Sequence, residues 1–554
     1  MNAMFQKQKA STKPADPTRI SLFVTIILLL LYGEFFILNS SFIVEDTKYF
    51  CLFDDAMISM RYAKNLAAGH GLVWNPGEAP LEGYTNFLWV MMMTGLHLLP
   101  VPPSKISMLV QICSLLLLCI NLVYVRRIAM IVTKSSFPAT TCALLFTAFY
   151  FPLNKWSLMG METGAVTLAI TMAVYHIMRM MRENTFSPVC YLILGIGTLI
   201  RIDVFLLFGI AVLTLFFLDK ANQNRHLIGG GGLLLLFLAG QTTFRIWYFH
   251  DILPNTYYLK MTGYPVWFRM TNGLQNTFNF VYGMNAFLFM MPFGLLLFDR
   301  KNRKLKICAV FIATQLFYSI YTGGDITDAK GLANRFLCIV MPAFFILFSH
   351  TLVLLRNILN DVLKDARFRF PGFFRTGFIG IIILCLLYLN AGPSCQYLKQ
   401  WLLMQKMAMV YANKHLVVSA DYISSITEPE ATVAVTWAGV LPYFLNRPVI
   451  DLLGKNDITV SRIKVDLEPY VRASGATRYT AFMPGHTKWD YGYSIGRLQP
   501  DIVWQLFPDR DFRFTRTALE EAFPFLYGRY VTKKFSKQEF FVKNNSPHIH
   551  WNKL

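Results

Sequence analysis

The chain has 554 residues, of which 55% are hydrophobic and 15% are charged, and its formal net charge is +20. Since an ordinary soluble domain carries roughly 25% charged residues, this composition excludes a single soluble globular protein. The Lys and Arg residues lie in short clusters between apolar runs, which is typical of cytoplasmic loops and not of a nucleic-acid-binding surface. We therefore expect a multi-pass α-helical membrane protein with no nucleic-acid partner.

Several apolar runs are long enough to cross a bilayer as a helix, which takes about 20 residues. They include Ile20–Ile37, Ile106–Val125, Leu227–Tyr248 and Phe336–Leu355, and a last span is expected at about Gly377–Leu389. Placing the basic clusters on the cytoplasmic side gives about eleven transmembrane helices. This topology predicts a cytoplasmic N-terminal tail (residues 1–19), a transmembrane domain (residues 20–391) and a periplasmic C-terminal domain (residues 392–554).

The segment Tyr84–Leu99 decides this topology, because it is apolar and could be counted as a span. Counting it would turn every later basic cluster outward, against the usual charge asymmetry. We therefore interpret it as a juxtamembrane or re-entrant helix within a first outer loop that covers residues 39–104.

Five acidic motifs then fall on the same outer side of the membrane. They contain Asp54 with Asp55, Glu162, Asp203, Asp251 and Asp325. Acidic residues contribute little to membrane orientation, so their shared side indicates a common site. For Asp203, a local ion pair with Arg201 is the alternative interpretation.

The first of these motifs lies at the start of a predicted helix, Asp54–Leu66. Helical spacing places Asp54, Ile58 and Arg61 on one face, with Asp55 beside them. An N-cap role would explain one aspartate but not two. Two neighbouring carboxylates can accept a proton from a hydroxyl, or Asp54 and Asp55 can hold a divalent cation such as Mg²⁺, Mn²⁺ or Ca²⁺.

The C-terminal part is more polar than the rest and is predicted to form an α/β domain. Strand-like segments are Ala431–Trp437, Pro448–Gly454 and Asp501–Phe507, and Ala438–Leu445 is compatible with a helix. Its Cys395 and the first loop's Cys51 would lie outside the membrane, where a disulfide is an alternative to two free thiols.

The segment FDDAMISMRYAKNLAAGHGLVWNPGE and the following EGYTNFLW resemble the first periplasmic loop of GT-C glycosyltransferases. The resemblance is strongest to the terminal arabinofuranosyltransferases of actinobacterial cell-wall assembly. Six later segments are similar in order and spacing: Trp156–Thr163, Leu199–Phe205, Leu253–Lys260, Gly323–Leu337, Ala438–Asp457 and Pro484–Tyr493. Together they extend the resemblance over nearly the whole chain.

The resemblance implies an inverting enzyme that moves a sugar from a polyprenyl-phosphate donor to a glycan, lipid or protein acceptor outside the cytoplasmic membrane. The family's base is an Asp in the first outer loop, here Asp54 or Asp55, and Asp54 is preferred because its helical face carries Arg61. The chain departs from the family where Pro commonly precedes Asp203, and in the insertion-like segment before Arg335. These departures leave the sugar and the acceptor open.

Further site residues follow from the same motifs. Arg61, Lys260 and Arg335 are expected to bind the donor phosphate, although snorkelling of their cationic ends is an alternative. The remaining candidates are site-lining residues (Glu162, Arg201, Asp203, Asn255, Tyr258 and Asp325) and acceptor-binding residues (Glu82, Tyr84 and His486). A lipid or polysaccharide transporter, and a non-catalytic membrane scaffold, are the alternative functions.

Overall fold

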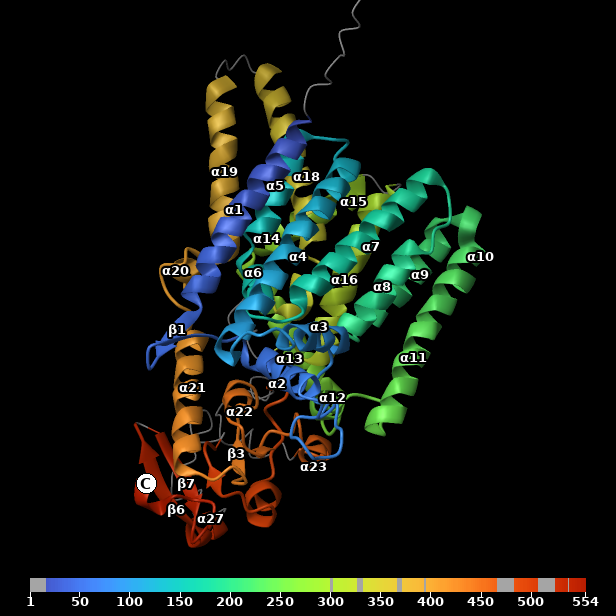
Figure 1. Ribbon diagram of the computed structural model, residues 1–554. Helices are drawn as coiled ribbons and strands as arrows, with labels where there is room; N and C mark the ends of the chain where they lie inside the picture. The colour runs from blue at the N-terminus through green and yellow to red at the C-terminus, as the bar shows by residue number, and fades with distance from the viewer. Residues whose placement is uncertain are drawn as a thin grey trace, which may run out of the picture.

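The computed structural model describes residues 16–298, 302–325, 332–365, 371–392, 395–465, 483–506, 524–536 and 538–554. The chain forms a tall helical bundle with a smaller mixed domain at one end (Figure 1). The two parts follow the change in composition near residue 392 that the sequence shows.

The helical bundle contains most of the long helices of the described chain. In chain order these are α1 (Pro17–Asn39), α4 (Pro103–Val132), α5 (Phe137–Ala148), α6 (Phe151–Leu158), α7 (Thr163–Glu183), α8 (Val189–Ile200), α9 (Val204–Leu218), α11 (Gly231–Phe249), α13 (Val266–Gly283), α16 (Arg303–Thr322), α18 (Met341–Asp365) and α19 (Pro371–Ala391). Short pieces complete it: η1 (Lys220–Asn222), α10 (Gln223–Arg225), η2 (His226–Gly230), α14 (Ala286–Met290), η3 (Met291–Gly294), α15 (Leu295–Phe298), α17 (Arg335–Cys338) and α20 (Leu398–Trp401).

Six helices of the described residues are long and apolar enough to cross a membrane, and five shorter apolar helices accompany them. The chain is therefore a multi-pass membrane protein. Most predicted spans match a helix, but Phe336–Leu355 does not: the chain forms the short α17 first, and the long α18 begins at Met341. This break matters because it places Arg335 outside the long helix.

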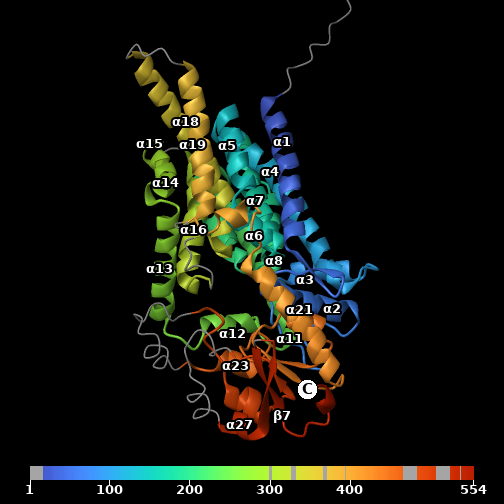
Figure 2. The ribbon, with the colours of Figure 1, turned by 90° about the vertical axis from the view of Figure 1, so that its left-hand side faces the viewer.

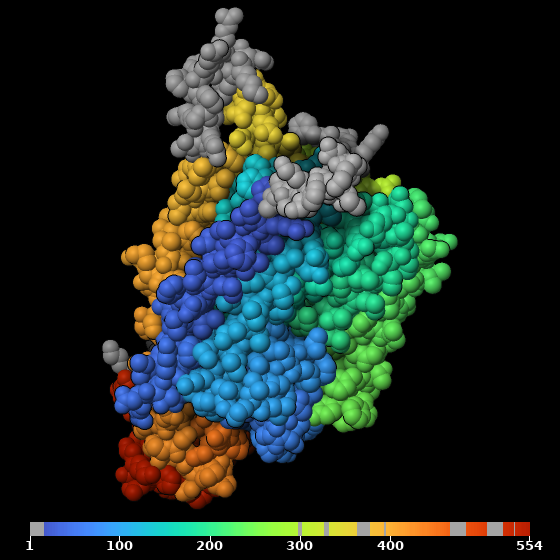
Figure 3. All heavy atoms as spheres, turned by 45° about the horizontal axis from the view of Figure 1, so that its top comes forward, coloured from blue at the N-terminus to red at the C-terminus, as the bar shows by residue number. Residues whose placement is uncertain are grey.

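The run from Lys220 to Phe249 differs from the other long helices in its position. Of the residues in its apolar window, only 6% are buried, compared with 72% for α7. In the space-filling view, the green surface of this helix forms one outer flank of the molecule (Figure 3). Its apolar side chains are therefore available to lipid.

The apolar segment Tyr84–Leu99 contains α3 (Phe87–His97), a helix of 11 residues. At 1.5 Å per residue it is about 16 Å long, which is roughly half the hydrocarbon thickness of a bilayer. It lies beside α2 (Asp54–Ala67), between the bundle and the C-terminal domain (Figure 1). The geometry agrees with a helix that does not span the membrane by itself.

The elements that carry the predicted site gather at one end of the bundle. The hairpin of β1 (Ser41–Val44) and β2 (Thr47–Phe50), the helices α2 and α3, and α12 (Asn255–Met261) all lie at the end that faces the C-terminal domain (Figures 1 and 2). The N-terminal end of α1, the C-terminal end of α18 and the N-terminal end of α19 lie at the opposite end.

The C-terminal domain contains a five-stranded sheet in the order β4-β3-β5-β7-β6. The strands β3 (Val433–Val435), β4 (Val449–Asp451) and β5 (Ile502–Val503) are parallel, and β6 (Tyr530–Phe535) and β7 (Gln538–Lys543) form an antiparallel hairpin. Its helical elements are α21 (Ala408–Ile426), α22 (Val440–Phe444), α23 (Ile458–Arg462), η5 (Gly492–Arg497), α27 (Pro524–Arg529) and η6 (Trp551–Lys553). The predicted strand segments contain β3, β4 and β5, and the β6–β7 hairpin was not predicted.

The carboxyl ends of β3 and β4 lie at the same edge of the sheet, because the two strands are parallel. The loop after β3 leads into α22, which packs against α2. Gly439 in this loop lies so close to the backbone of Asp54 that a Cβ there would come within 1.9 Å of its carbonyl oxygen. This edge of the sheet therefore faces the start of the first-loop helix.

All nine cysteines are free thiols. Cys51 is buried and Cys395 is exposed, so the disulfide considered from the sequence does not form. The fold is held by packing and polar contacts without a covalent crosslink.

Candidate functional site

A cavity of about 830 Å³ lies where the bundle meets the C-terminal domain. Side chains from α2, α9, α12, α16 and α17 line it, together with the segments before α7 and α9. Lys455 and Pro484 contribute from the C-terminal domain. The cavity therefore combines parts of the chain that are more than 400 residues apart in sequence.

The structure brings eight of the predicted site residues to this cavity and places six others away from its lining. The eight are Asp55, Tyr84, Glu162, Arg201, Asp203, Lys260, Asp325 and Arg335. The six are Asp54, Arg61, Glu82, Asn255, Tyr258 and His486.

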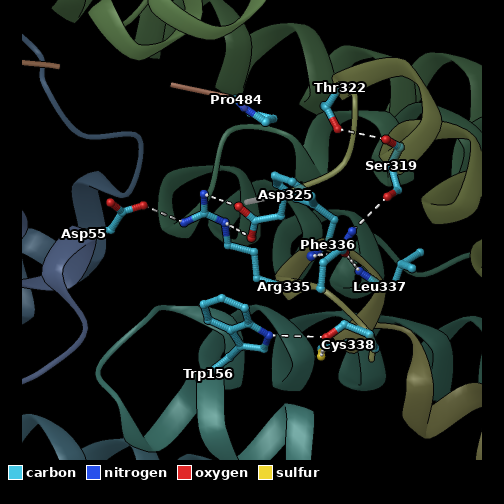
Figure 4. Close-up of polar contacts among 12 residues, drawn as sticks. Asp55, Trp156, Ser319, Thr322, Asp325, Arg335, Phe336, Leu337, Cys338 and Pro484 are labelled. Carbon is cyan, nitrogen blue, oxygen red and sulfur yellow. Dashed lines mark hydrogen bonds and ion pairs between the residues drawn. The ribbon is translucent and has the colours of Figure 1, made fainter. Parts of the chain in front are cut away.

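Asp55 is held between two cations. Its Oδ2 lies 3.1 Å from Nη1 of Arg335, and its Oδ1 accepts a hydrogen bond from Nζ of Lys455. Arg335 also pairs with Asp325, with Nε 3.1 Å from Oδ2, and so lies between two carboxylates (Figure 4). Burial favours the neutral acid, but Lys455, Arg335 and Lys260 outweigh this effect and hold the pKa of Asp55 well below its usual value.

The position of Arg335 follows from the local cap of α17. The side chain of Asn334 accepts hydrogen bonds from the backbone N–H groups of Phe336 (3.0 Å) and Leu337 (2.9 Å). Its amide in turn donates to Ser319 on α16 (2.9 Å). An Asn at this position is a strong helix start signal, so the guanidinium is presented by a fixed turn.

Lys260 at the end of α12 differs from the other cations of the cavity. Among the described residues, no carboxylate lies within ion-pair distance of its amine. Burial and the neighbouring Arg335 and Lys455 lower the pKa of Lys260 to about 8. Its ammonium is thus still the main form at neutral pH and is available to an anionic ligand.

A second polar group lies at another part of the cavity lining. Arg201 donates to both oxygens of Asp203, at 2.6 Å and 3.0 Å, and its Nη1 lies 3.8 Å from Glu162. Glu162 also accepts a hydrogen bond from Asn86 (3.1 Å), and Asn86 accepts one from Ser59 (3.1 Å). The ion pair between Asp203 and Arg201 therefore forms, and both residues still line the cavity.

The face expected to carry Asp54, Ile58 and Arg61 is divided in the structure, because Ile58 lines the cavity while Asp54 and Arg61 do not. Asp54 and Arg61 share the face that packs on the C-terminal domain, whereas Asp55 and Ser59 face the cavity. Oδ1 of Asp54 accepts a hydrogen bond from the backbone N–H of Val440 (2.9 Å), and burial raises the pKa of Asp54 to about 6. The preference for Asp54 on account of Arg61 thus loses its basis.

Arg61, predicted to bind the donor phosphate, lies away from the cavity lining, and its guanidinium is engaged by other groups. It donates to the carbonyl of Trp74 (2.6 Å), to Oδ1 of Asn75 (2.8 Å) and to backbone carbonyls of the C-terminal domain. Those carbonyls belong to Pro442, Leu445 and Arg447. Arg61 joins the first loop to the C-terminal domain and does not reach the cavity.

Two further site predictions fall on residues that hold the fold together. Glu82 forms a buried ion pair with Arg245 of α11 at 2.7 Å, so it is not available to an acceptor. Asn255 is not on the cavity lining, since its amide donates to the carbonyls of Gly454 (3.0 Å) and Lys455 (2.9 Å).

Tyr258 and His486 also lie away from the cavity lining. The hydroxyl of Tyr258 donates to Asp251 (2.7 Å), which pairs with Arg462 of the C-terminal domain. Burial lowers the pKa of His486 to about 4, and its Nδ1 lies 3.3 Å from the carbonyl of Pro484. Its neighbour Pro484, and not His486 itself, lines the cavity.

Lys455 is the functional candidate that the sequence analysis missed. It lies within the motif Ala438–Asp457, but no local pattern connects it with Asp55, which is 400 residues earlier. The signal that could have found it is the single cation directly after the predicted strand Pro448–Gly454, because ligand-binding residues commonly follow the strands of an α/β sheet.

The carboxylates of Asp54 and Asp55 are poorly arranged to bind a divalent cation. Both oxygens of Asp55 face cationic side chains, and Asp54 points toward Val440, so the two carboxylates do not converge. No group of three or more His, Cys, Asp and Glu residues in the described chain could hold a metal ion. The residues do not fit the metal site considered from the sequence.

The charged residues of the described cavity lining balance each other. Four carboxylates (Asp55, Glu162, Asp203 and Asp325) face four cations (Arg201, Lys260, Arg335 and Lys455). The lining also contains two buried hydroxyls without a hydrogen-bond partner among the described residues, those of Tyr84 and Thr256. Buried polar groups are normally paired, so these two are suited to contact a polar ligand.

Comparison with known proteins gives a family of no assigned activity and several similar folds. A family described as a domain of unknown function (DUF8728) matches residues 404–527. No curated protein sequence matches the chain.

Solved structures of two membrane proteins are similar to nearly the whole chain. For ArnT from Cupriavidus metallidurans bound to undecaprenyl phosphate, the TM-score is 0.56 at 12% identity, covering 95% of this chain and 98% of that chain. For the oligosaccharyltransferase of Archaeoglobus fulgidus in the apo form, it is 0.53 at 9% identity, covering 88% and 69%. The archaeal enzyme AglB in complex with an inhibitory peptide and a dolichol-phosphate gives 0.51 at 10% identity, with the same coverage. At these identities the similarity shows the fold, and the chain has a GT-C-like multi-pass membrane fold.

Proposed function

We propose that the chain is an integral-membrane glycosyltransferase that moves a sugar from a polyprenyl-phosphate donor to a hydroxyl of a glycan, lipid or protein acceptor. The observation that carries this proposal is the composition of the single cavity described above. This cavity of about 830 Å³ has apolar side chains on one side. It also contains a group of cations and the carboxylate of Asp55.

The apolar side of the cavity suits a lipid-linked substrate. Phe205 of α9 and Phe317 of α16 line the cavity and are also 37% and 71% exposed on the surface of the bundle. The two helices pack against each other, so these exposed apolar side chains lie on neighbouring helices of the cavity wall. A polyprenyl chain can remain in the bilayer while its phosphate enters here. The similar ArnT structure binds undecaprenyl phosphate, which supports this route.

The cations suit the phosphate that leaves the sugar. Lys260 has no carboxylate partner among the described residues, and Arg335 lies on the cavity lining between Asp55 and Asp325. Charge-assisted contacts of this kind stabilise the negative charge that develops on the leaving oxygen. Tyr84 and Thr256 lie on the same cavity lining, and their buried hydroxyls have no hydrogen-bond partner among the described residues.

Asp55 is the proposed base. Its carboxylate takes the proton of the acceptor hydroxyl while the hydroxyl oxygen attacks the anomeric carbon. The bond from that carbon to the phosphate oxygen breaks, and its electron pair leaves with the polyprenyl phosphate. Attack opposite the leaving group inverts the configuration, and one negative charge passes from Asp55 to the phosphate. The step uses no divalent cation.

The finer assignments rest on the sequence resemblance. Among lipid-linked sugars, a pentosyl donor with arabinofuranose is the candidate that the resemblance favours. The charge pattern of the loops supports a cytoplasmic N-terminus and a periplasmic C-terminal domain at the cytoplasmic membrane. The acceptor then meets the cavity from the side of that domain.

The test is sugar transfer in nanodiscs or membranes that contain the intact chain and a panel of polyprenyl-phosphate sugars. Conversion of the donor to polyprenyl phosphate and incorporation of labelled sugar are both measured. Asp55→Asn is expected to lower the rate about 100- to 10,000-fold, as the loss of a general base does. Asp421→Asn, an exposed aspartate in the C-terminal domain, is the matched control and is expected to keep the rate of the intact chain.

Two results would contradict the proposal. If no polyprenyl-phosphate sugar is consumed by the folded intact chain, the enzyme class is wrong. If Asp54→Asn abolishes transfer and Asp55→Asn does not, Asp54 is the base and the role of the cavity-facing aspartate is wrong.

A further inference from the structure

The amine of Lys455 lies in the cavity although its loop belongs to the C-terminal domain. The side chain is 11% exposed, and its Nζ donates a hydrogen bond to Oδ1 of Asp55. Lys455 is thus the one charged side chain that the described C-terminal domain contributes to the cavity lining.

The loop that contains Lys455 is held by hydrogen bonds to both the C-terminal domain and the helical bundle. On the side of the sheet, Asp451 accepts hydrogen bonds from the backbone N–H of Leu453 (3.0 Å) and from the backbone (2.8 Å) and side chain (3.0 Å) of Asn456. Gly454 takes the left-handed conformation, with φ of 79°, that turns the loop back.

On the side of the bundle, Tyr62 of α2 donates to Oδ1 of Asn456 (3.0 Å), and Asn255 of α12 donates to the carbonyl of Lys455 (2.9 Å). The backbone at Lys455 is therefore positioned independently of the contact that its own side chain makes with Asp55.

The two cations beside Asp55 differ in how firmly they are held. Arg335 contacts Asp325 through Nε and Nη2, at 3.1 Å and 3.3 Å, in addition to Asp55. Among the described residues, Asp55 is the one carboxylate that the amine of Lys455 contacts. A lysine amine on a flexible stem can also change partners more easily than a planar guanidinium. Lys455 is the cation that can leave Asp55.

The proposed reaction transfers one negative charge from Asp55 to the leaving phosphate. A cation that contacts Asp55 before the reaction and the phosphate during it stays beside the negative charge as that charge moves. Its contact with the phosphate stabilises the transition state. Building on the proposed function, we propose that Lys455 is a donor-phosphate ligand supplied by the C-terminal domain, and that it exchanges Asp55 for the phosphate when the donor binds.

This exchange activates the base only when the donor is present. In this structure Asp55 faces Lys455 and Arg335 directly, and Asp54, Lys260, Asp325 and His486 lie around this group. With Lys455 in contact, Asp55 is a weak proton acceptor. Once Lys455 contacts the phosphate, Asp55 keeps Arg335 but loses one of its two direct cationic partners, and its affinity for a proton increases.

The experiment compares the purified intact chain with Lys455→Met, Lys455→Arg and Lys464→Met in nanodiscs. Lys464 is an exposed lysine nine residues later and serves as the matched control. Two quantities are measured: binding of undecaprenyl phosphate alone, by native mass spectrometry or calorimetry, and the pH profile of kcat/KM with a polyprenyl-phosphate sugar. Thermal unfolding of each variant checks its folding.

We expect Lys455→Met to weaken the binding of undecaprenyl phosphate about 10-fold and to lower kcat about 100-fold, which is the usual effect of removing one electrostatic contact to the transition state. The acidic limb of its kcat/KM profile moves to higher pH, because Asp55 has lost a neighbouring cation. Lys455→Arg restores most of the binding and the rate, and Lys464→Met behaves as the intact chain.

Unchanged binding and rate in well-folded Lys455→Met would overturn the inference while leaving the proposed function in place. A loss of rate that Lys455→Arg does not rescue, without a move of the acidic limb, would also overturn it, since that pattern indicates a structural role. If the intact chain transfers no sugar, the proposed function fails, and unchanged binding of undecaprenyl phosphate to Lys455→Met then overturns the phosphate contact separately.

Discussion

Replacing Arg61 by Met tests the connection between the first loop and the C-terminal domain. The guanidinium is 5% exposed and has two good acceptors in the first loop, Trp74 (2.6 Å) and Asn75 (2.8 Å). It has further acceptors in the C-terminal domain, including the carbonyl of Arg447 at 3.2 Å. Methionine fills a similar volume but donates no hydrogen bond, so these buried acceptors lose a partner.

The cost follows from the number of contacts. Each hydrogen bond to a charged group contributes about 1.5–3 kcal/mol, but such contributions do not add fully when the groups share one side chain. Removing one member of a buried charged network typically costs about 3–5 kcal/mol, and we expect this value for Arg61→Met. For a unit of 150–250 residues, that lowers Tm by roughly 10 °C.

The assay is thermal unfolding in detergent together with limited proteolysis of the C-terminal domain. Lys64→Met is the control on the same helix, because its amine contacts Tyr443 and Asn446 at the surface, and it is expected to cost about 1 kcal/mol or less. An unchanged Tm in Arg61→Met would refute the reasoning. A loss of undecaprenyl phosphate binding at unchanged Tm would instead restore the role in phosphate binding that the sequence predicted.

Two further predictions concern buried carboxyl groups. Since the folded state raises the pKa of Asp54 to about 6, it binds this proton more tightly than the unfolded chain does, and stability falls as the pH rises from about 4 to about 6. Asp54→Asn keeps the acceptor for Val440 but carries no charge, so at pH 7 its free energy of unfolding should exceed that of the intact chain by about 3 kcal/mol. Thermal scans should therefore show a higher Tm for the variant at pH 7 and an equal Tm at pH 4. Glu82→Gln leaves Arg245 without its charge partner, so thermal unfolding should show a loss of about 3–5 kcal/mol, and an unchanged Tm would contradict this.

The parts of the fold that could be predicted from sequence are those with a local signal. Length and hydropathy predict helices such as α1 and α4, and the acidic start predicts α2 over nearly its full length. The charge pattern predicted a juxtamembrane or re-entrant helix at Tyr84–Leu99, and the 11 residues of α3 are consistent with that interpretation. The break before Met341 was missed, because Asn334 caps α17 within a continuous apolar run, and the cap requires Ser319 from another helix.

The sequence predicted most of the residue types in the site, but not which face of α2 would meet the cavity and which the C-terminal domain. The spacing of Asp54, Asp55 and Arg61 gives their relative angles on the helix, yet no periodicity says which face meets another domain. That choice depends on Val440 and Pro442, which are nearly 400 residues later in the chain. The same distance explains why Lys455 was missed: its contact with Asp55 depends on how the sheet docks onto the bundle, and no local sequence pattern indicates that docking.

The balance of four carboxylates and four cations around the cavity has a consequence for product release under the proposed reaction. An electroneutral cavity lining exerts little long-range attraction on anionic lipid headgroups, so it does not accumulate them from the bilayer. After transfer, the proton from the acceptor masks the charge of Asp55 while the phosphate carries its additional charge. When Asp55 then gives that proton to water, its carboxylate repels the spent polyprenyl phosphate, so the departure of the lipid is coupled to the departure of the proton.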